Sequence, residues 1–215
     1  MARPKTDLHA LSCGPLPQRI ALAARADARA ELLLLLAGDE ATPVRLAVAA
    51  NPGAPRHADR ILARDPVASI RASLARKLAE HAAEMAGPGW DSLRHLARDP
   101  APQVRQSIAD TLADQPGAPH DLVLALARDT DPAVSEPLIR LSHVLTEADL
   151  LGLVDAPPGP EARCAVARRL NLGPMLAEAL VGSGDGAAIA ALRRNPTARI
   201  PAHLRSRLEA LASTR

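Results

Sequence analysis

Arginine supplies most of the side chains in this sequence that could bind an anionic ligand. Lys5 and Lys77 are the only lysines among 26 basic residues. The planar guanidinium group binds carboxylates and phosphates through two parallel hydrogen bonds. The second half of the chain contains the arginines that we consider for contact with an anion or a nucleic acid: Arg163, Arg168, Arg169, Arg193, Arg194, Arg199, Arg205 and Arg207.

The C-terminal stretch concentrates this charge. Between positions 193 and 215, six arginines accompany a single acidic residue, Glu209. The net charge of the whole chain is only +2, so an anion site must be a local patch. The stretch could form a surface for a phosphate backbone. The alternative interpretation is a solvated terminal face that keeps an Ala- and Leu-rich protein in solution.

Other chemistries find little support in the sequence. The seven histidines lack the spacing that holds zinc on one helix face, and His81 with Glu80 and Glu84 forms the best but weak cluster. The Gly-rich segment 182–186 lacks the Lys and Ser/Thr of a P-loop, so we interpret it as a turn. We therefore predict a non-enzymatic protein with no catalytic residue, no cofactor and no metal.

The composition favours helices. Phe and Tyr are absent, Trp90 is the only aromatic residue, and Ala, Leu and Arg dominate. Ala and Leu are strong helix formers, whereas sheets prefer β-branched and aromatic residues. We predict an all-α fold in which Trp90 packs over a seam between helices, with exposure as the alternative. The two cysteines, Cys13 and Cys164, form no CxxC pair and fit a reducing compartment.

A repeated phrase indicates how the helices are organised. Three segments place an aliphatic residue five positions after an Asp and an Arg six positions after it, and a fourth, from Asp129, keeps the frame without the Arg. Copies of about 30 residues, each with two helical segments, are typical of an α-solenoid. The Asp and Arg of the three complete corners are Asp39, Arg45, Asp65, Arg71, Asp99 and Arg105.

The residue types at each corner have a physical explanation. We expect the Asp to cap the helix that follows and the Arg to bond an Asp of its own or a neighbouring corner, which gives a ladder along the stack. Anion contact by the same arginines is the alternative. A second phrase begins at Asn51, Gln115 and Asn195, and we expect Asn there to adopt a left-handed helix cap.

The pattern divides the chain into three regions. Residues 1–17 form a flexible N-terminal arm, 18–140 the regular repeats, and 141–215 variant repeats that continue or cap the solenoid. Thr146 with Asp149 predicts a capping box in the last region. The expected fold is a right-handed superhelix of stacked helix pairs. The chain shows no secretory signal and no apolar run long enough to span a bilayer, so we expect a cytoplasmic protein.

The corners resemble HEAT-like repeats, and the phrase from Asn51 is similar to the leucine-rich-repeat variant. The segments 141–150, 165–170, 179–186 and 192–200 resemble, in that order, a bacterial family of HEAT-like proteins known only as a domain of unknown function. The resemblance covers roughly residues 30–210 and implies a helical solenoid without implying an activity. This chain has no cysteine cluster to match the iron–sulfur segment that repeat-variant proteins can carry.

These observations predict a scaffold that binds a protein or peptide on the concave face, lined by the second helix of each pair. The expected contacts are exposed residues of those helices: Arg76, Lys77, Gln106 and Asp110. The first alternative is nucleic-acid binding through the C-terminal arginines. A weaker alternative is a DNA glycosylase like those of the HEAT-like class, which would need aromatic residues that this chain lacks.

Overall fold

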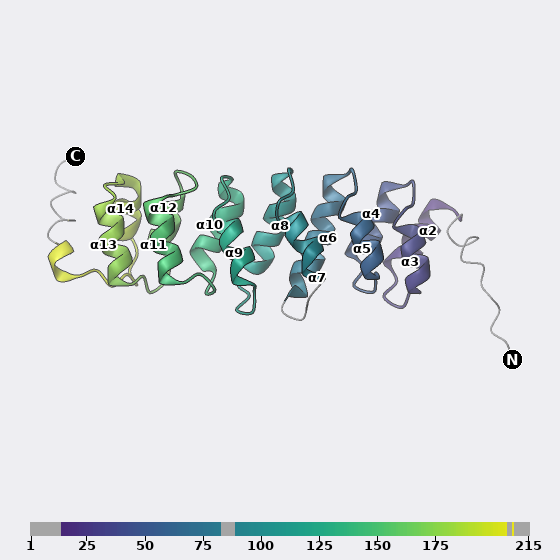
Figure 1. Cartoon of the computed structure of the whole chain (residues 1–215), viewed down its shortest axis with the longest axis horizontal. Helices are drawn as coiled ribbons and strands as arrows, with labels where there is room; N and C mark the ends of the chain where they lie inside the picture. Colours follow the sequence, from purple (N-terminus) through teal and green to yellow (C-terminus); the bar gives the residue numbers. More distant parts are fainter. Residues whose placement is uncertain (1–13, 83–88, 206–207, 209–215) are drawn as a thin grey trace. The chain divides into compact units, whose positions relative to one another are not determined.

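The structure is a computed structural model that describes residues 14–82, 89–205 and 208. Those residues contain helices and no strand, as the composition predicted (Figure 1). Residues 1–13 of the predicted N-terminal arm, 1–17, lie outside the described residues, and the first helix that the structure describes, α2, begins at Leu16. None of the described helices has the length and apolar character needed to cross a membrane.

The chain divides into two compact units, residues 1–108 and 109–215. Unit 1 pairs a longer helix with a shorter one repeatedly. The helices α2 (Leu16–Ala24), α4 (Thr42–Ala50) and α6 (Ala68–Glu80) pack in one layer, and α3 (Ala30–Leu36), α5 (Arg56–Leu62) and α7 (Gly89–Leu96) pack in a second layer. Helix α8 (Pro102–Leu112) follows, and the division between the units falls within it, after Ile108.

Unit 2 repeats the two-layer arrangement. Helix α9 (His120–Ala127) packs on α10 (Pro132–Leu141), and α10 is followed in its own layer by α12 (Ala162–Ala167) and α14 (Gly186–Arg193). The other layer joins α11 (Glu147–Asp155) to α13 (Pro174–Gly182). In both units the second helix of each pair therefore packs on the second helix of the next.

Aliphatic side chains of the corners form part of the core, as the repeat predicted. Val44, Ile70, Val104 and Val134 are completely buried. Burial of such a side chain contributes about 1.5–3 kcal/mol. The remaining core consists mainly of Leu and Ala, which lets short helices approach closely.

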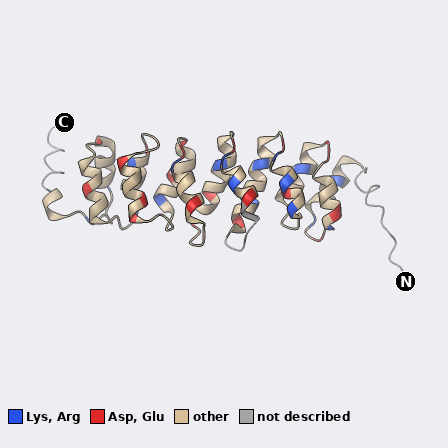
Figure 2. Cartoon of the chain, in the orientation of Figure 1, with Lys and Arg blue, Asp and Glu red and all other residues tan. Residues whose placement is uncertain are grey.

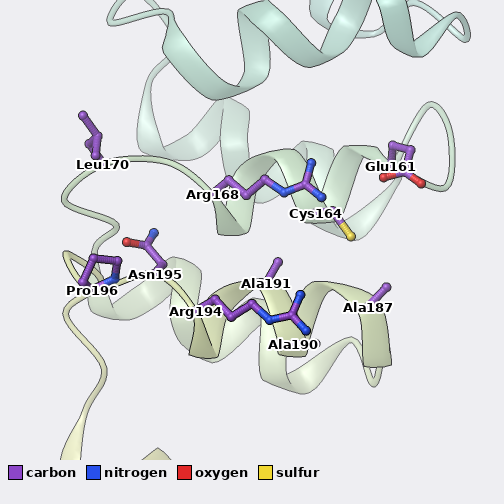
Figure 3. A pocket seen from close by; sticks show the side chains of 10 residues that line it. All are labelled: Glu161, Cys164, Arg168, Leu170, Ala187, Ala190, Ala191, Arg194, Asn195 and Pro196. Atoms are coloured by element: carbon purple, nitrogen blue, oxygen red, sulfur yellow. The ribbon is translucent and has the colours of Figure 1, made fainter.

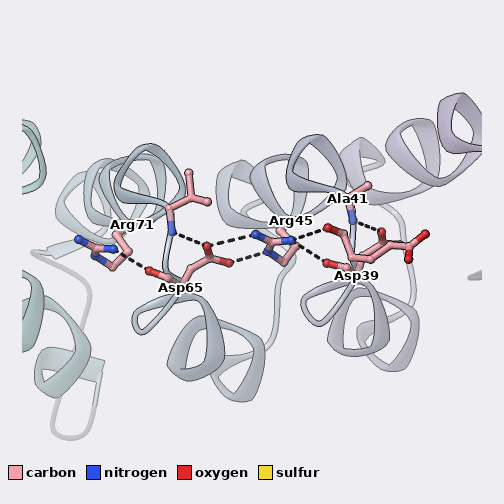
Figure 4. Close-up of polar contacts among 7 residues, drawn as sticks. Asp39, Ala41, Arg45, Asp65 and Arg71 are labelled. Carbon is pink, nitrogen blue, oxygen red and sulfur yellow. Dashed lines mark hydrogen bonds and ion pairs between the residues drawn. The ribbon is translucent and has the colours of Figure 1, made fainter.

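The corner arginines join successive repeats of unit 1 (Figure 4). Arg45 donates through Nε to Asp65 at 2.6 Å, and Arg71 donates to Asp99 at 2.6 Å. The second guanidinium nitrogen of each completes a bidentate pair, at 3.3 Å and 2.9 Å respectively. Each arginine also donates to a carbonyl of its own corner, such as Arg45 Nη1 to Asp39 O at 2.8 Å. Arg45 and Arg71 are therefore occupied within the fold.

The corner aspartates do not cap helices in the way we expected. Asp39 accepts from the backbone amide of Ala41 at 2.8 Å, and Ala41 is itself the N-cap of α4. Asp65 likewise accepts from the amide of Val67, the N-cap of α6. The carboxylate lies two residues before the N-cap, so it closes a tight turn and cannot reach the first free amides of the helix. In the fourth copy the corner residue Asp129 likewise accepts from the amide of Asp131 at 2.9 Å. Asp131 is itself the N-cap of α10 and does cap it, by accepting from Ala133 at 2.9 Å.

A second series of contacts joins the C-terminal ends of the second helices. In each contact, a side chain near the C-terminal end of one second helix donates a hydrogen bond to the second helix of the previous repeat. The acceptor is the backbone carbonyl of that helix's C-cap residue, or of the residue after the C-cap. We call this series the C-cap relay, and its members are Asn51 to Arg25 O at 2.8 Å, Lys77 to Asn51 O at 3.3 Å, Arg169 to Ser142 O at 2.9 Å, and Asn195 to Arg169 O at 2.6 Å. The relay satisfies carbonyls that a helix end leaves without partners.

Asn51 shows that our expectation of a left-handed cap was wrong. Its φ is −78° and its ψ is 119°, an extended conformation. The side chain is 3% exposed, its amide nitrogen donates to Ala23 O and Arg25 O, and its oxygen accepts from Gly53 N. Asn is present because it donates and accepts at a buried position, and not because of its backbone freedom.

Candidate functional site

A groove of about 490 Å³ lies between α12 and α14 of unit 2 (Figure 3). Both are second helices of their pairs, the helices that were predicted to line the binding face. We call it the α12–α14 groove. Its lining residues are Glu161, Cys164, Arg168, Leu170, Ala187, Ala190, Ala191, Arg194, Asn195 and Pro196.

Two of the predicted anion contacts, Arg168 and Arg194, meet in this groove. Arg168 is the C-cap of α12 and Arg194 is the C-cap of α14, so adjacent helices place them at equivalent ends. Both side chains are exposed and extend along the groove in the same direction (Figure 3). Within the part of the chain that the structure describes, neither guanidinium has a hydrogen-bond or ion-pair partner.

The groove is open because α14 offers small side chains to it. Ala187, Ala190 and Ala191 lie on one helical face and line the groove. Cys164 of α12 is 5% exposed. Burial raises the pKa of its thiol, and the negative charges of Glu161 and Asp185 raise it further. The thiol is therefore protonated at neutral pH, and it packs as a small apolar group and does not serve as a nucleophile.

The lining changes in character along the groove. Leu170, which is 75% exposed, and Pro196 lie at one end, with the guanidinium groups between this end and the other (Figure 3). Glu161, also exposed, lies toward the opposite end with Ala187. A ligand would meet an apolar end, then two positive charges, then a negative charge.

Arg169 and Arg163, two of the other predicted anion contacts, are engaged in the fold. Arg169 donates to Ile139 O and Ser142 O, and burial lowers the pKa of its guanidinium group. Two of its guanidinium nitrogens are thus occupied within the fold, which disfavours the predicted anion contact. Arg163 donates to Val154 O at 2.8 Å and approaches Asp185 at 4.0 Å.

The remaining C-terminal arginines are on the surface. Arg193, Arg199 and Arg205 are exposed, and Arg193 lines a shallow hollow beside Arg194. Arg207 lies outside the described residues. Unit 2 nevertheless has 13 acidic and 11 basic residues between positions 109 and 215, a net charge of −2. The basic side chains therefore form a local feature of an otherwise acidic unit.

The residues predicted to contact a partner divide between surface and core. Arg76 and Asp110 are exposed and Gln106 is half-buried. Lys77 was expected to be exposed, but it is buried, with 7% exposure. Its ammonium group donates to Asp59 at 2.6 Å, and this ion pair between α5 and α6 explains why the side chain turns inward.

Asp59 occupies a position that apolar residues fill in other repeats. Counted back from the corner Asp, its equivalents are Leu33 in α3 and Leu93 in α7, both completely buried. Burial raises the pKa of Asp59, although the charge of Lys77 acts in the opposite direction. Sequence reasoning did not predict the ion pair between Asp59 and Lys77, because the two residues are 18 positions apart. The presence of Asp where other repeats have Leu is the one sequence feature that indicates it.

The structure groups no three His, Cys, Asp or Glu residues in a way that could hold a metal ion, as far as the described residues extend. Glu84, from the weak cluster with Glu80 and His81, lies outside them. His81 Nδ1 lies 2.9 Å from Lys77 O at the end of α6. Trp90 is the second residue of α7, but its side chain lies outside the described set, so its packing stays a prediction.

The comparison with protein families identifies only the second part of the chain. Residues 134–213 match the family described as "Uncharacterised protein conserved in bacteria (DUF2336)". The match covers α10 to α14, less than half of the chain, and agrees with the resemblance of the second half to a bacterial domain of unknown function. No curated protein and no solved structure matches the sequence.

Proposed function

We propose that this chain is a HEAT-like α-solenoid, wound as a right-handed superhelix, that acts as a non-enzymatic cytoplasmic scaffold for a protein or peptide. The helix pairs of each unit and the layers of second helices support this architecture. The corner pairs Arg45–Asp65 and Arg71–Asp99 support it too, because they hold neighbouring repeats together. In this proposal the second helices form the concave binding face.

The observation that carries the proposal is the α12–α14 groove. Arg168 and Arg194 lie side by side there without internal partners, above a floor of alanines. Two adjacent guanidinium groups bind carboxylates through charge-assisted, bidentate hydrogen bonds. Leu170 and Pro196 add an apolar end that can take an aliphatic side chain. The expected ligand is an acidic peptide segment with an apolar residue beside its carboxylates.

A peptide suits this groove better than a nucleic acid does. Glu161 lies in the groove and would repel a phosphate backbone, and the unit has a net charge of −2. Single-stranded nucleic acids need aromatic platforms on which bases stack, and Trp90 of unit 1 is the only aromatic residue of the chain. Both features favour a short ligand with a few carboxylates over a long polyanion.

Selection from a random peptide display library against the full-length chain tests the proposal. We expect enriched peptides to carry Asp or Glu next to Leu, Ile or Val. The double variant Arg168→Gln/Arg194→Gln should weaken the binding of a selected, labelled peptide at least about tenfold, since charged hydrogen bonds contribute about 1.5–3 kcal/mol each. Arg140→Gln, a change of an exposed arginine on α10, is the matched control and should bind normally.

Two results would contradict the proposal. Selected peptides could lack acidic residues, or the double variant could bind them as tightly as the unchanged protein does. In either case the α12–α14 groove is not the binding site, and the exposed residues Arg76 and Asp110 become the next positions to substitute.

The exposure of Arg193, Arg199 and Arg205 favours nucleic-acid binding as the second candidate. Titration of labelled duplex DNA at 50 and 200 mM salt tests it. Six or more phosphate contacts reduce the affinity roughly a thousandfold over this range. A weak, salt-insensitive interaction would remove this candidate.

A further inference from the structure

The first-helix layer of unit 1 has a basic face that the sequence pattern did not single out. Helices α5 and α7 pack on each other. The arginines of these helices and of the residues that directly follow them are all exposed; those of α5 are visible in Figure 2. We call the set the α5–α7 basic face, and its residues are Arg56, Arg60, Arg64, Arg94 and Arg98.

The arginines recur at equivalent positions of two neighbouring repeats. Arg60 and Arg94 lie five residues before the corner Asp of their repeats, and Arg64 and Arg98 lie directly before it. Helix α3 and its following turn have Leu34 and Gly38 at these two positions. Helix α9 and its following residue have Leu124 and Arg128 there, so among the four corners only those of Asp65 and Asp99 have arginine at both positions.

The acidic residues closest to this face in sequence do not cancel its charge. Asp59, Asp65 and Asp99 are each buried, with 6–7% exposure. Each is already paired with a cation from a second helix: Asp59 with Lys77, Asp65 with Arg45 and Asp99 with Arg71. Asp91 is the one exposed acidic residue of α5 and α7. Unit 1 as a whole has 15 basic and 11 acidic residues.

We propose that the α5–α7 basic face binds the phosphate backbone of duplex nucleic acid. Residues four apart on a helix are about 5–6 Å apart, and packed helices are roughly 8–10 Å apart. Arg60, Arg64 and Arg98 thus lie within a patch about 10 Å across. Each strand of a duplex presents one phosphate per 3.4 Å of the axis, so about three phosphates of one strand lie over such a patch.

The chemistry of the face favours a duplex over a protein or a single strand. Protein interfaces also use arginine, but they combine it with aromatic and apolar anchors at the centre. This face is rich in arginine, and Ile61, 49% exposed, is the large apolar residue that the structure exposes on α5. Contact with the phosphate backbone of a nucleic acid needs no aromatic side chain for stacking, and it positions a duplex without recognising its sequence.

Fluorescence anisotropy with a labelled 20-base-pair duplex and the full chain tests this inference. The variant Arg60→Gln/Arg64→Gln/Arg98→Gln should bind at least about tenfold more weakly at 100 mM salt. The loss of three phosphate contacts should also reduce the slope of log K against log salt by about 2.7. The control Arg29→Gln/Arg128→Gln/Arg140→Gln makes the same change of charge at exposed arginines outside every candidate surface, and it should keep the affinity and the slope. A unit 2 variant, Arg193→Gln/Arg199→Gln/Arg205→Gln, removes the same charge from the C-terminal surface.

The same experiment can overturn the inference. If the unit 2 variant loses binding and the unit 1 variant keeps it, the C-terminal arginines are the nucleic-acid surface. The face is not a nucleic-acid site if the unchanged protein does not bind the duplex at 50 mM salt. The same holds if it binds vesicles with 30% phosphatidylserine and does not bind the duplex. Circular dichroism of each variant shows whether the helices are retained, and the peptide assay on the α12–α14 groove gives an independent result.

Discussion

At the scale of single residues, the buried pair Lys77–Asp59 is the contact on which unit 1 depends most sharply. The ammonium group bonds Asp59 at 2.6 Å and Asn51 O at 3.3 Å, so it links α6 to both α5 and the end of α4. A buried charge that loses its partner costs far more than the pair contributes. The effect of a substitution therefore depends on whether one or both residues are changed.

We predict that Lys77→Met lowers the free energy of unfolding by about 3–5 kcal/mol, because Asp59 is left buried without a cation. The double variant Asp59→Leu/Lys77→Met should recover most of this loss, since Leu33 and Leu93 fill the equivalent position in other repeats. Urea unfolding of the three proteins measures both effects. A single variant as stable as the unchanged protein would show that the pair contributes nothing.

The residues of the candidate sites could be predicted only in part. Arg168 and Arg194 were predicted as anion contacts because arginines concentrate in the second half of the chain. Arg169, next to Arg168, has the same residue type but turns inward to Ser142 O. Neighbouring arginines on a short helix point in different directions, and the sequence does not show which carbonyls lie within reach of each.

At the scale of elements, helix α11 depends on its capping box. Thr146 Oγ1 accepts from Asp149 N, and Asp149 accepts from Thr146 N at 2.8 Å. His120 of α9 lies 2.8 Å from the same carboxylate. Burial acts to raise the pKa of Asp149, but the hydrogen bonds from His120 and Thr146 outweigh it, and the pKa falls from 3.8 to about 2. The ionised carboxylate therefore stabilises the start of α11.

This shift predicts the direction of a pH effect. The pKa of Asp149 is lower in the folded than in the unfolded state, so its contribution is complete above pH 4 and is lost as the pH falls toward 2. Relative to Asp149→Asn, the unchanged protein should be more stable by about 1 kcal/mol near pH 6, as for other N-terminal caps. The difference should vanish near pH 2 in urea unfolding experiments. An advantage that persists there would exclude ionisation of Asp149 as its cause.

Element boundaries were predictable where the sequence carries local signals. The capping box at Thr146 and the helix from Gly186 follow from residues within one turn. The apolar residues over 18–38 indicate one helical region with either a bend or a short turn near residues 26–28, and the structure has two helices there, α2 and α3. Arg25 already bonds Asp27 in the intervening turn, a contact that the period of apolar residues does not indicate.

At the scale of the whole molecule, the corner ion pairs should determine how cooperatively the repeats unfold. Stability in stacked repeats is a sum of terms within repeats and terms between neighbours. We predict that Arg71→Met lowers both the urea midpoint and the m-value, because repeats joined through Asp99 then unfold more independently. Arg76→Met changes an exposed arginine of the same helix and should leave both values unchanged. Equal behaviour of the two variants would refute this role of Arg71.

The helical architecture was the most predictable property because it rests on many residues at once. Composition and the repeated Asp-to-Arg spacing indicate helix pairs, and the pairs Arg45–Asp65 and Arg71–Asp99 lie where that spacing places them. The C-cap relay was not predictable by residue type, because Asn51, Lys77 and Arg169 perform the same task with different chemistry. Only the 26-residue interval between Asn51 and Lys77 could have indicated their equivalence.

The Lys77 contact of the C-cap relay also means that the repeats of unit 1 are not interchangeable parts. Deletion of residues 39–64 would bring Asp65 to the place of Asp39, within reach of Arg19, so the corner pairing would survive. Lys77 would then take the place of Asn51, but Asp59 would have been removed with the deleted segment. A shortened chain would thus keep its register and acquire a buried, uncompensated cation. The order of the repeats is encoded by this matched pair, and loss of this repeat requires a compensating substitution at position 77.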